Sequence, residues 1–142
     1  MQTRLSGECR PEQVGRGQGP ACAPADHRAA ARAARGGAEA LGLTLWARDP
    51  ATRSDTVTAV RVPAGVDDRE LRARARAESG VMLSGGQGEL AGTVLQIGHM
   101  GPAAYPLGPV IALVALGRAL RGLGAAADIG AAVEAAVAAL GA

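Results

Sequence analysis

The sequence predicts an α+β domain in which a small antiparallel sheet of three to four strands is covered on one face by helices. Two observations predict this fold class. Four segments have the apolar spacing of helices, at residues 27–41, 67–78, 108–123 and 127–140, and short segments typical of strands lie between the first and the third. No internal repeat and no second domain interrupt this order, so one sheet and one helical layer account for it.

The first helix is expected from His27 to Leu41, with Asp26 as its N-cap and Gly42 as its C-terminal stop. A narrow apolar stripe on this helix should face the core: Ala30, Ala33, Ala34 and Leu41. Its polar side chains should face water: Arg28, Arg32, Arg35 and Glu39.

Two strands are expected next, from Leu43 to Trp46 and from Thr56 to Val62, with a polar turn between them. Pro63 and Gly65 stop the second strand. Its side chains alternate in two sets: Val57, Ala59 and Arg61 on one side, and Thr58, Val60 and Val62 on the other.

Asp67, followed three residues later by Glu70, forms a capping pair for a helix that runs to about Glu78, and Gly80 supplies its stop. Its apolar side chains are Leu71 and Ala75. The opposite face is expected to be solvated rather than to bind phosphates: Arg69, Arg72 and Arg76.

Strands are also expected at Val81 to Leu83 and Thr93 to Ile97, joined by the glycine-rich loop SGGQGELAG. Two helices close the chain, from Gly108 to Leu123 and from Ala127 to Leu140. The last helix has an apolar stripe that should face the core: Ile129, Val133, Val137 and Leu140.

The composition argues against some kinds of partner and site. All 15 basic residues are arginine, so the 142 residues contain no lysine, and a net charge of +2 argues against nucleic acid as a partner. Cys9 and Cys22 lack the further His or Cys ligands of a zinc site and fit reduced thiols in a cytoplasmic protein.

Residues 1–25 are expected to be a disordered leader before one domain at 26–142. We expect no secretory signal and no membrane span, since the longest apolar run, Pro109 to Leu116, is short.

Three phrases follow one another along the chain as they do in class V aminotransferases: TVTAVRVP at 56–63, GVMLSGGQGELAG at 80–92 and TVLQIGHMG at 93–101. More narrowly, the chain resembles the carboxy-terminal domain of the alanine–glyoxylate or serine–glyoxylate (serine–pyruvate) type over about residues 27–142. The corner IGHMG at 97–101 is the most specific part of this resemblance, which the leader does not share.

The resemblance implies the small-domain fold of type I pyridoxal-phosphate enzymes, which are dimers. In them a larger amino-terminal domain supplies the lysine that forms the Schiff base, an aspartate and the phosphate site. Arginine cannot replace that lysine, because it stays protonated and does not condense with an aldehyde. The resemblance therefore implies that this chain alone binds no pyridoxal phosphate.

The small domain of that family contributes an arginine that binds the substrate's α-carboxylate, and the matching position here is Gln96. A glutamine amide is neutral and cannot form the bidentate charged contact of a guanidinium, which should weaken substrate binding by about 2 to 3 kcal/mol. Gln96 is thus a degenerate carboxylate position. The alternative is a polar side chain that caps a cleft or faces solvent on an edge strand.

Two further polar residues receive structural roles. His99 is expected to be a hydrogen-bonded residue at a strand end rather than a base or a metal ligand. Ser84 is expected to cap or turn, because no histidine and carboxylate accompany it as in a nucleophile elbow. We therefore expect no catalytic and no metal-binding residue.

These features favour a truncated or separated aminotransferase domain that cannot transaminate alone, with a large aminotransferase domain or a second copy as its partner. The Arg-, Gly- and Pro-rich leader fits a frameshift product of GC-rich DNA. A stand-alone interaction or dimerisation module is the alternative, for which exposed apolar surface would argue. Weak nucleic-acid binding ranks last and would use three arginines: Arg69, Arg72 and Arg76.

Overall fold

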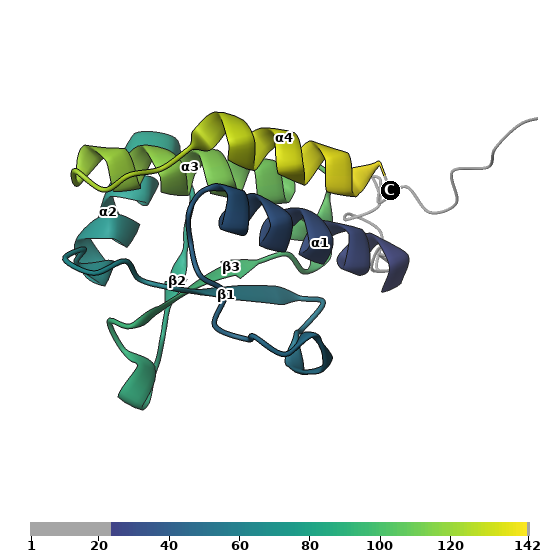
Figure 1. The fold of residues 1–142 in the computed structure, drawn as a ribbon, viewed down its shortest axis with the longest axis horizontal. Coiled ribbons are helices and arrows are strands. Elements are labelled where there is room, and N and C mark those ends of the chain that lie inside the picture. Colours follow the sequence, from purple (N-terminus) through teal and green to yellow (C-terminus); the bar gives the residue numbers. More distant parts are fainter. Residues whose placement is uncertain (1–23, 142) are drawn as a thin grey trace, which may run out of the picture.

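A three-stranded antiparallel sheet and four α-helices make up the fold, as a computed structural model of residues 24–141 shows (Figure 1). The strands are β1 (Val57–Arg61), β2 (Ser84–Gly85) and β3 (Val94–Gly98), in the order β1-β3-β2. The helices are α1 (Pro24–Ala40), α2 (Asp68–Ser79), α3 (Gly108–Gly122) and α4 (Ile129–Leu140). Figure 1 shows α1, α3 and α4 together on one side of the sheet, so the predicted fold class is confirmed.

Three short 3₁₀ turns lie in the loops: η2 (Pro50–Thr52), η3 (Gly88–Leu90) and η4 (Gly101–Ala104). The first lies within the predicted polar turn, with Asp49 as a cap that accepts a hydrogen bond from the amide of Ala51. Figure 1 shows the β2–β3 loop, which contains η3, extending away from the helices.

The core lies between the sheet and the helices. Because side chains alternate along a strand, Val60, Leu95 and Ile97 share the face that is turned toward the helices, and each is 1% exposed. They belong to one apolar cluster with leucines of the helical layer: Leu71, Leu113, Leu116 and Leu120. The sheet is thus covered on this one face, as predicted.

Helix α4 turns a partly different face inward from the one predicted. Its buried residues are Ala132 and Ala136, whereas Val137 is 51% exposed. Gly37 of α1 lies against these two alanines, so the two helices approach too closely for larger side chains. The predicted stripe is therefore right only in part: Ile129 and Leu140 are half-buried and pack against the core, whereas Val137 is exposed and the fully buried positions are alanines.

Some predicted boundaries are also corrected. Helix α1 begins at Pro24, so Asp26 lies in its first turn and not at the N-cap. The segment 43–46 forms only an isolated bridge between Leu45 and Val60. Val81 and Leu83 are not a strand; they pack against the core, and the pairing with β3 is shifted to β2.

Helix α2 has the predicted caps. The side chain of Asp67 accepts a hydrogen bond from the amide of Glu70 at 2.8 Å, and Gly80 adopts the left-handed conformation at φ 67°. Leu71 and Ala75 are buried as predicted.

One arginine of α2 is not a free surface residue. Arg72 donates two hydrogen bonds to the carboxylate of Asp68, at 3.1 and 2.9 Å, and Asp68 is only 5% exposed. This pair lies over Gly85, where an added Cβ would be 2.9 Å from an oxygen of Asp68. The pair therefore joins α2 to β2, and the expected solvated row of three arginines is interrupted at Arg72.

Residues 1–23 and 142 are outside the described part of the chain, and the predictions for Cys9 and Cys22 lie there. So does nearly all of the expected leader at 1–25. The division into a leader and a domain at 26–142 therefore stays a prediction.

Candidate functional site

The face of the sheet turned away from α1, α3 and α4 is called the open face below. Gln96 of β3 lies on this face between two neighbours, since Ala59 of β1 pairs with it on one side and Ser84 of β2 on the other. The amide of Trp46 donates to the carbonyl of Ala59 at 2.9 Å, so Trp46 lies beside Ala59 on the side away from Gln96. Four positions thus cross the open face at one level: Trp46, Ala59, Gln96 and Ser84.

The placement of Gln96 corrects one alternative. β3 is the central strand, so Gln96 is not on an edge strand, and its side chain is half-buried rather than fully exposed. Ser84 likewise lies in β2 and not in a turn or cap. Its neighbour across the sheet is an amide, and the described residues place no histidine beside it.

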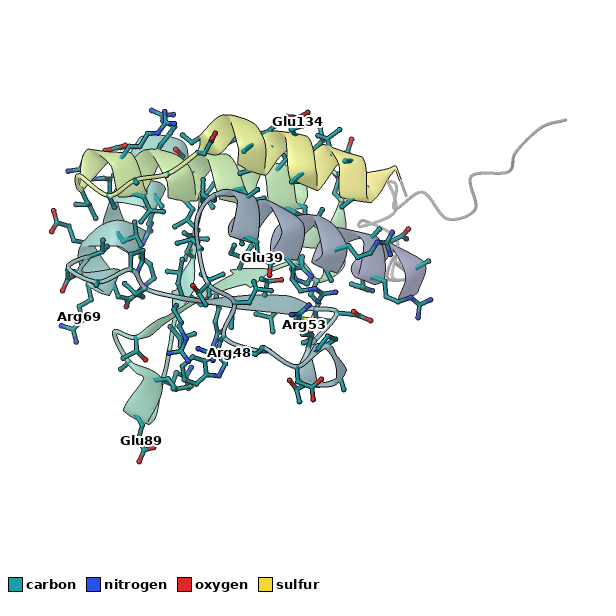
Figure 2. The ribbon with its side chains drawn as sticks, in the orientation of Figure 1. Glu39, Arg48, Arg53, Arg69, Glu89 and Glu134 are labelled. Atoms are coloured by element: carbon teal, nitrogen blue, oxygen red, sulfur yellow. The ribbon has the colours of Figure 1, made fainter. Side chains whose placement is uncertain are left out.

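An arginine and the single tryptophan form a cation–π pair beside this row. The Cζ atom of Arg61 lies 4.5 Å from the centre of the Trp46 ring, and both side chains are exposed. A cation over an aromatic face is held by the ring's quadrupole, so the guanidinium is restrained at this place. Figure 2 shows that Arg48 also lies on this side of the sheet.

A shallow pocket of about 160 Å³ adjoins the row at Ala59. Its walls come from β1, Trp46 and the loop after it, with Arg35 of α1 and Arg53 among the lining residues. Arg53 donates to the carbonyls of Ala47 and Arg48, both at 3.1 Å, and so holds this loop in shape. The pocket is therefore a hollow at the β1 edge of the sheet, lined by residues of both faces and by two arginines.

Arg35 ties α1 to the start of β1. It donates to the carbonyl of Ser54 at 3.0 Å, and its other nitrogen lies 3.9 Å from the carboxylate of Asp55. Burial lowers the pKa of Arg35, an effect that Asp55 opposes. The expectation that Arg35 faces water is wrong, because its side chain is 17% exposed and holds the loop.

His99 lies on the other face of the sheet from Gln96 and is completely buried. Its Nδ1 is 3.0 Å from the carbonyl oxygen of Asp55, which can only accept, so Nδ1 carries the proton. Its Nε2 is 2.9 Å from the hydroxyl of Thr58. Both nitrogens are engaged, which agrees with the expected structural role and leaves neither available to a substrate.

The surroundings of His99 favour its neutral form. Burial lowers the pKa of this imidazole, and the positive charge of Arg35 lowers it further, whereas the hydrogen bond to Asp55 raises it. In the neutral form Nε2 accepts from the Thr58 hydroxyl. His99 thus joins β3 to β1 and the loop before it as a neutral hydrogen-bonding group.

The structure brings together residues that sequence reasoning did not combine. Gln96 was singled out, but Arg61 and Trp46 were not assigned to the same site. The signal was present: Ala59 and Arg61 share one side of a predicted strand, and Trp46 is the only tryptophan. Within residues 24–141, no group of three His, Cys, Asp or Glu side chains could hold a metal ion, and no helix is long and apolar enough to cross a membrane.

Comparison with known proteins gives a consistent set of relatives. The chain is 46% identical over 121 residues to a pyridoxamine–pyruvate transaminase of Mesorhizobium japonicum, covering 85% of this chain and 31% of the relative. It is 45% identical over 75 residues to the alanine–glyoxylate aminotransferase of Callithrix jacchus, covering 53% of this chain and 18% of the relative. No protein-family model matches the chain.

A solved structure agrees with the sequence match. The crystal structure of a pyridoxamine–pyruvate aminotransferase from Mesorhizobium loti superposes with a TM-score of 0.80 at 46% identity, over 82% of this chain and 30% of that one. The chain therefore spans about 30% of the length of the two pyridoxamine–pyruvate relatives, and less of the alanine–glyoxylate one, and it has the fold of that part.

Proposed function

Since the chain is related to the class V aminotransferases and corresponds to their carboxy-terminal domain, we propose that it is the small domain of a pyridoxal-phosphate-dependent transaminase. The reaction would exchange an amino group between a small amino donor and a keto acid such as pyruvate or glyoxylate. The large domain would come from further polypeptide or a separate chain, in the cytoplasm, where Cys9 and Cys22 stay reduced.

One observation carries the proposal. Identity of 46% extends over 121 residues, and a TM-score of 0.80 accompanies it over nearly the same share of the chain. The names of these relatives describe transamination with pyruvate or glyoxylate, which supports the same reaction class here.

The residues of this chain do not fit the cofactor on their own. Pyridoxal phosphate is held in this class through a Schiff base to a lysine amine, and the sequence contains no lysine. Arginine, the only other strong base, does not condense with the cofactor's aldehyde. We propose that the chain alone is not catalytic and that any lysine must be supplied by a large domain.

Gln96 is the proposed place where the substrate meets this domain. It is half-buried at the centre of the open face, between Ala59 and Ser84. An amide there offers neutral hydrogen bonds where the family has a guanidinium, so we propose weaker binding of the substrate carboxylate.

A second candidate function, an interaction module, is favoured by exposed apolar side chains at the start of α3. Leu107 and Ile111 are 50% and 56% exposed and four residues apart, so they share a helix face, and Tyr105 beside them is 49% exposed. We call these three residues the α3 patch. Apolar surface of this kind is favoured at a protein contact, so it would pair with the large domain or with a second copy.

A chimera tests the proposed function. Residues 26–142 replace the matching region of the Mesorhizobium japonicum transaminase, and absorbance is recorded after pyridoxal phosphate is added to the chimera and to the isolated chain. The chimera is expected to show the absorbance of a Schiff base, and the isolated chain is expected to show none. A band from the isolated chain, or a folded chimera that cannot bind the cofactor, would contradict the proposal.

A further inference from the structure

Arg61 presents an exposed guanidinium whose hydrogen-bond donors are not used within the described part of the chain. The guanidinium lies over the ring of Trp46, with Cζ 4.5 Å from the ring centre. This cation–π contact restrains the guanidinium, while its N–H groups stay available. Arg72, by contrast, donates two hydrogen bonds to Asp68.

The position of Arg61 brings it near Gln96. The register pairs Ala59 with Gln96 and Arg61 with Val94, so Arg61 and Gln96 are diagonal neighbours on the open face. Diagonal neighbours on a sheet are about 7 Å apart, within reach of long side chains. Ala59, whose side chain is one methyl group, lies between Trp46 and Gln96 in this row.

The charge around this spot favours an anion. Arg48 lies on the same side of the sheet, whereas Glu89, in the β2–β3 loop, points away at the far tip of that loop (Figure 2). Arg35 and Arg53 line the neighbouring pocket, but both donate to backbone carbonyls, so the charge available to an anion here comes from Arg61 and Arg48. A small anion above Ala59 would therefore meet positive charge and the neutral amide of Gln96.

We propose that Arg61, held against Trp46, binds the carboxylate of a small keto acid on the open face, with the Gln96 amide as a second donor. A planar guanidinium matches the two oxygens of a carboxylate, which accept two parallel hydrogen bonds. This inference deepens the proposed function, since it names the cation that takes over from the arginine missing at position 96.

The test uses the full ¹⁵N-labelled chain and sodium pyruvate as the probe. Trp46 is the only tryptophan, so its indole N–H gives a single resonance next to the proposed site. Titration with pyruvate should move this resonance to saturation, whereas the uncharged amide pyruvamide at the same ionic strength should not. The Arg61→Gln variant should bind pyruvate at least about tenfold more weakly, because a hydrogen bond to a charged group is lost.

Arg69→Gln is the matched control. Arg69 is an exposed arginine that Figure 2 shows on α2, pointing into solvent, and its removal should leave the pyruvate affinity within about twofold. Arg61→Lys keeps the charge but loses the fork of donors, so it should fall between the wild type and Arg61→Gln.

Three results would overturn the inference: no saturable shift in the wild type, equal affinity in Arg61→Gln, or pyruvamide binding as tightly as pyruvate. None of them affects the chimera. If the chimera binds pyridoxal phosphate but the pyruvate affinity is unchanged in Arg61→Gln, only the inference about Arg61 is contradicted, and the proposed function stands.

Discussion

The Nε2 atom of His99 lies 2.9 Å from the hydroxyl oxygen of Thr58, in the buried layer between the sheet and the helices. Gln96 is only three residues earlier in the same segment, yet its side chain is on the open face. The alternation of β3 thus separates a residue that holds the sheet together from one on the open face, where we propose that the substrate binds.

Stability should depend on pH through His99. Because its pKa is lowered in the folded state, the unfolded chain binds more protons as the pH falls below about 6.5. The stability that neutral His99 contributes is therefore fully present above that pH, and it is lost as the pH falls toward the pKa of His99 in the folded state. We expect His99→Gln to flatten this part of the profile of unfolding free energy measured with urea. His27→Gln removes the other histidine as a control; an unchanged slope in His99→Gln would contradict the assignment.

The contact between α1 and α4 predicts opposite effects for two adjacent glycines. A Cβ at Gly37 would overlap Leu113 and lie 3.0 Å from the carbonyl oxygen of Ala132, whereas nothing is within 4 Å of a Cβ at Gly36. Gly37→Ala should destabilise the fold by about 1 to 3 kcal/mol through overpacking. Gly36→Ala should stabilise it by about 0.5 to 1 kcal/mol, because alanine favours a helix. Thermal unfolding of both variants checks the sign of each change.

The same contact shows what sequence could predict. Local signals succeeded: Asp67 and Gly80 bound α2 because caps depend on neighbouring residues. The stripe on α4 was right for Ile129 and Leu140 but wrong for Val137, because the close approach of Gly37 places Ala132 and Ala136 at the centre of the contact. β2 was misplaced and the pairing of Arg61 with Trp46 was missed for a similar reason, since both depend on register between distant segments. The phrase TVLQIGHMG identified Gln96, but the sequence did not predict that its strand lies in the middle of the sheet.

The buried carboxylate of Asp68 should matter more than a similar pair on the surface. Asp68→Ala removes the partner of Arg72 over Gly85 and should cost about 1 to 3 kcal/mol of unfolding free energy. Glu78→Ala breaks the exposed pair with Arg74, which joins residues four apart at 2.8 Å, and should cost less than about 1 kcal/mol. Equal losses in chemical denaturation would contradict the anchoring role of Asp68.

Restoring a cation at position 96 should strengthen carboxylate binding. Gln96→Arg adds a second guanidinium diagonal to Arg61, so pyruvate should bind at least about tenfold more tightly than to the wild type. The Trp46 indole resonance reports the affinity. Gln87→Arg, an exposed position in the β2–β3 loop, serves as the control for added charge. Equal gains in both variants would indicate a general charge effect instead.

The α3 patch should be needed for contact with a larger partner. Ile111→Glu is expected to abolish binding to the large domain of the Mesorhizobium japonicum transaminase in sedimentation or pull-down experiments. Val137→Glu changes a similarly exposed residue, 51% against 56%, on α4 and should retain binding. Since both side chains are exposed, neither change should unfold the chain. Binding by Ile111→Glu would place the contact elsewhere.

An assay of transamination shows whether this chain needs a large domain for catalysis. The purified chain is incubated with pyridoxal phosphate, pyridoxamine and pyruvate, with and without the large domain of the Mesorhizobium japonicum relative, and alanine is measured. We predict no alanine from the chain alone, because its 142 residues contain no lysine, and more alanine from the mixture than from the large domain by itself. Alanine formed by the chain alone, or a mixture no more active than the large domain, would contradict the account.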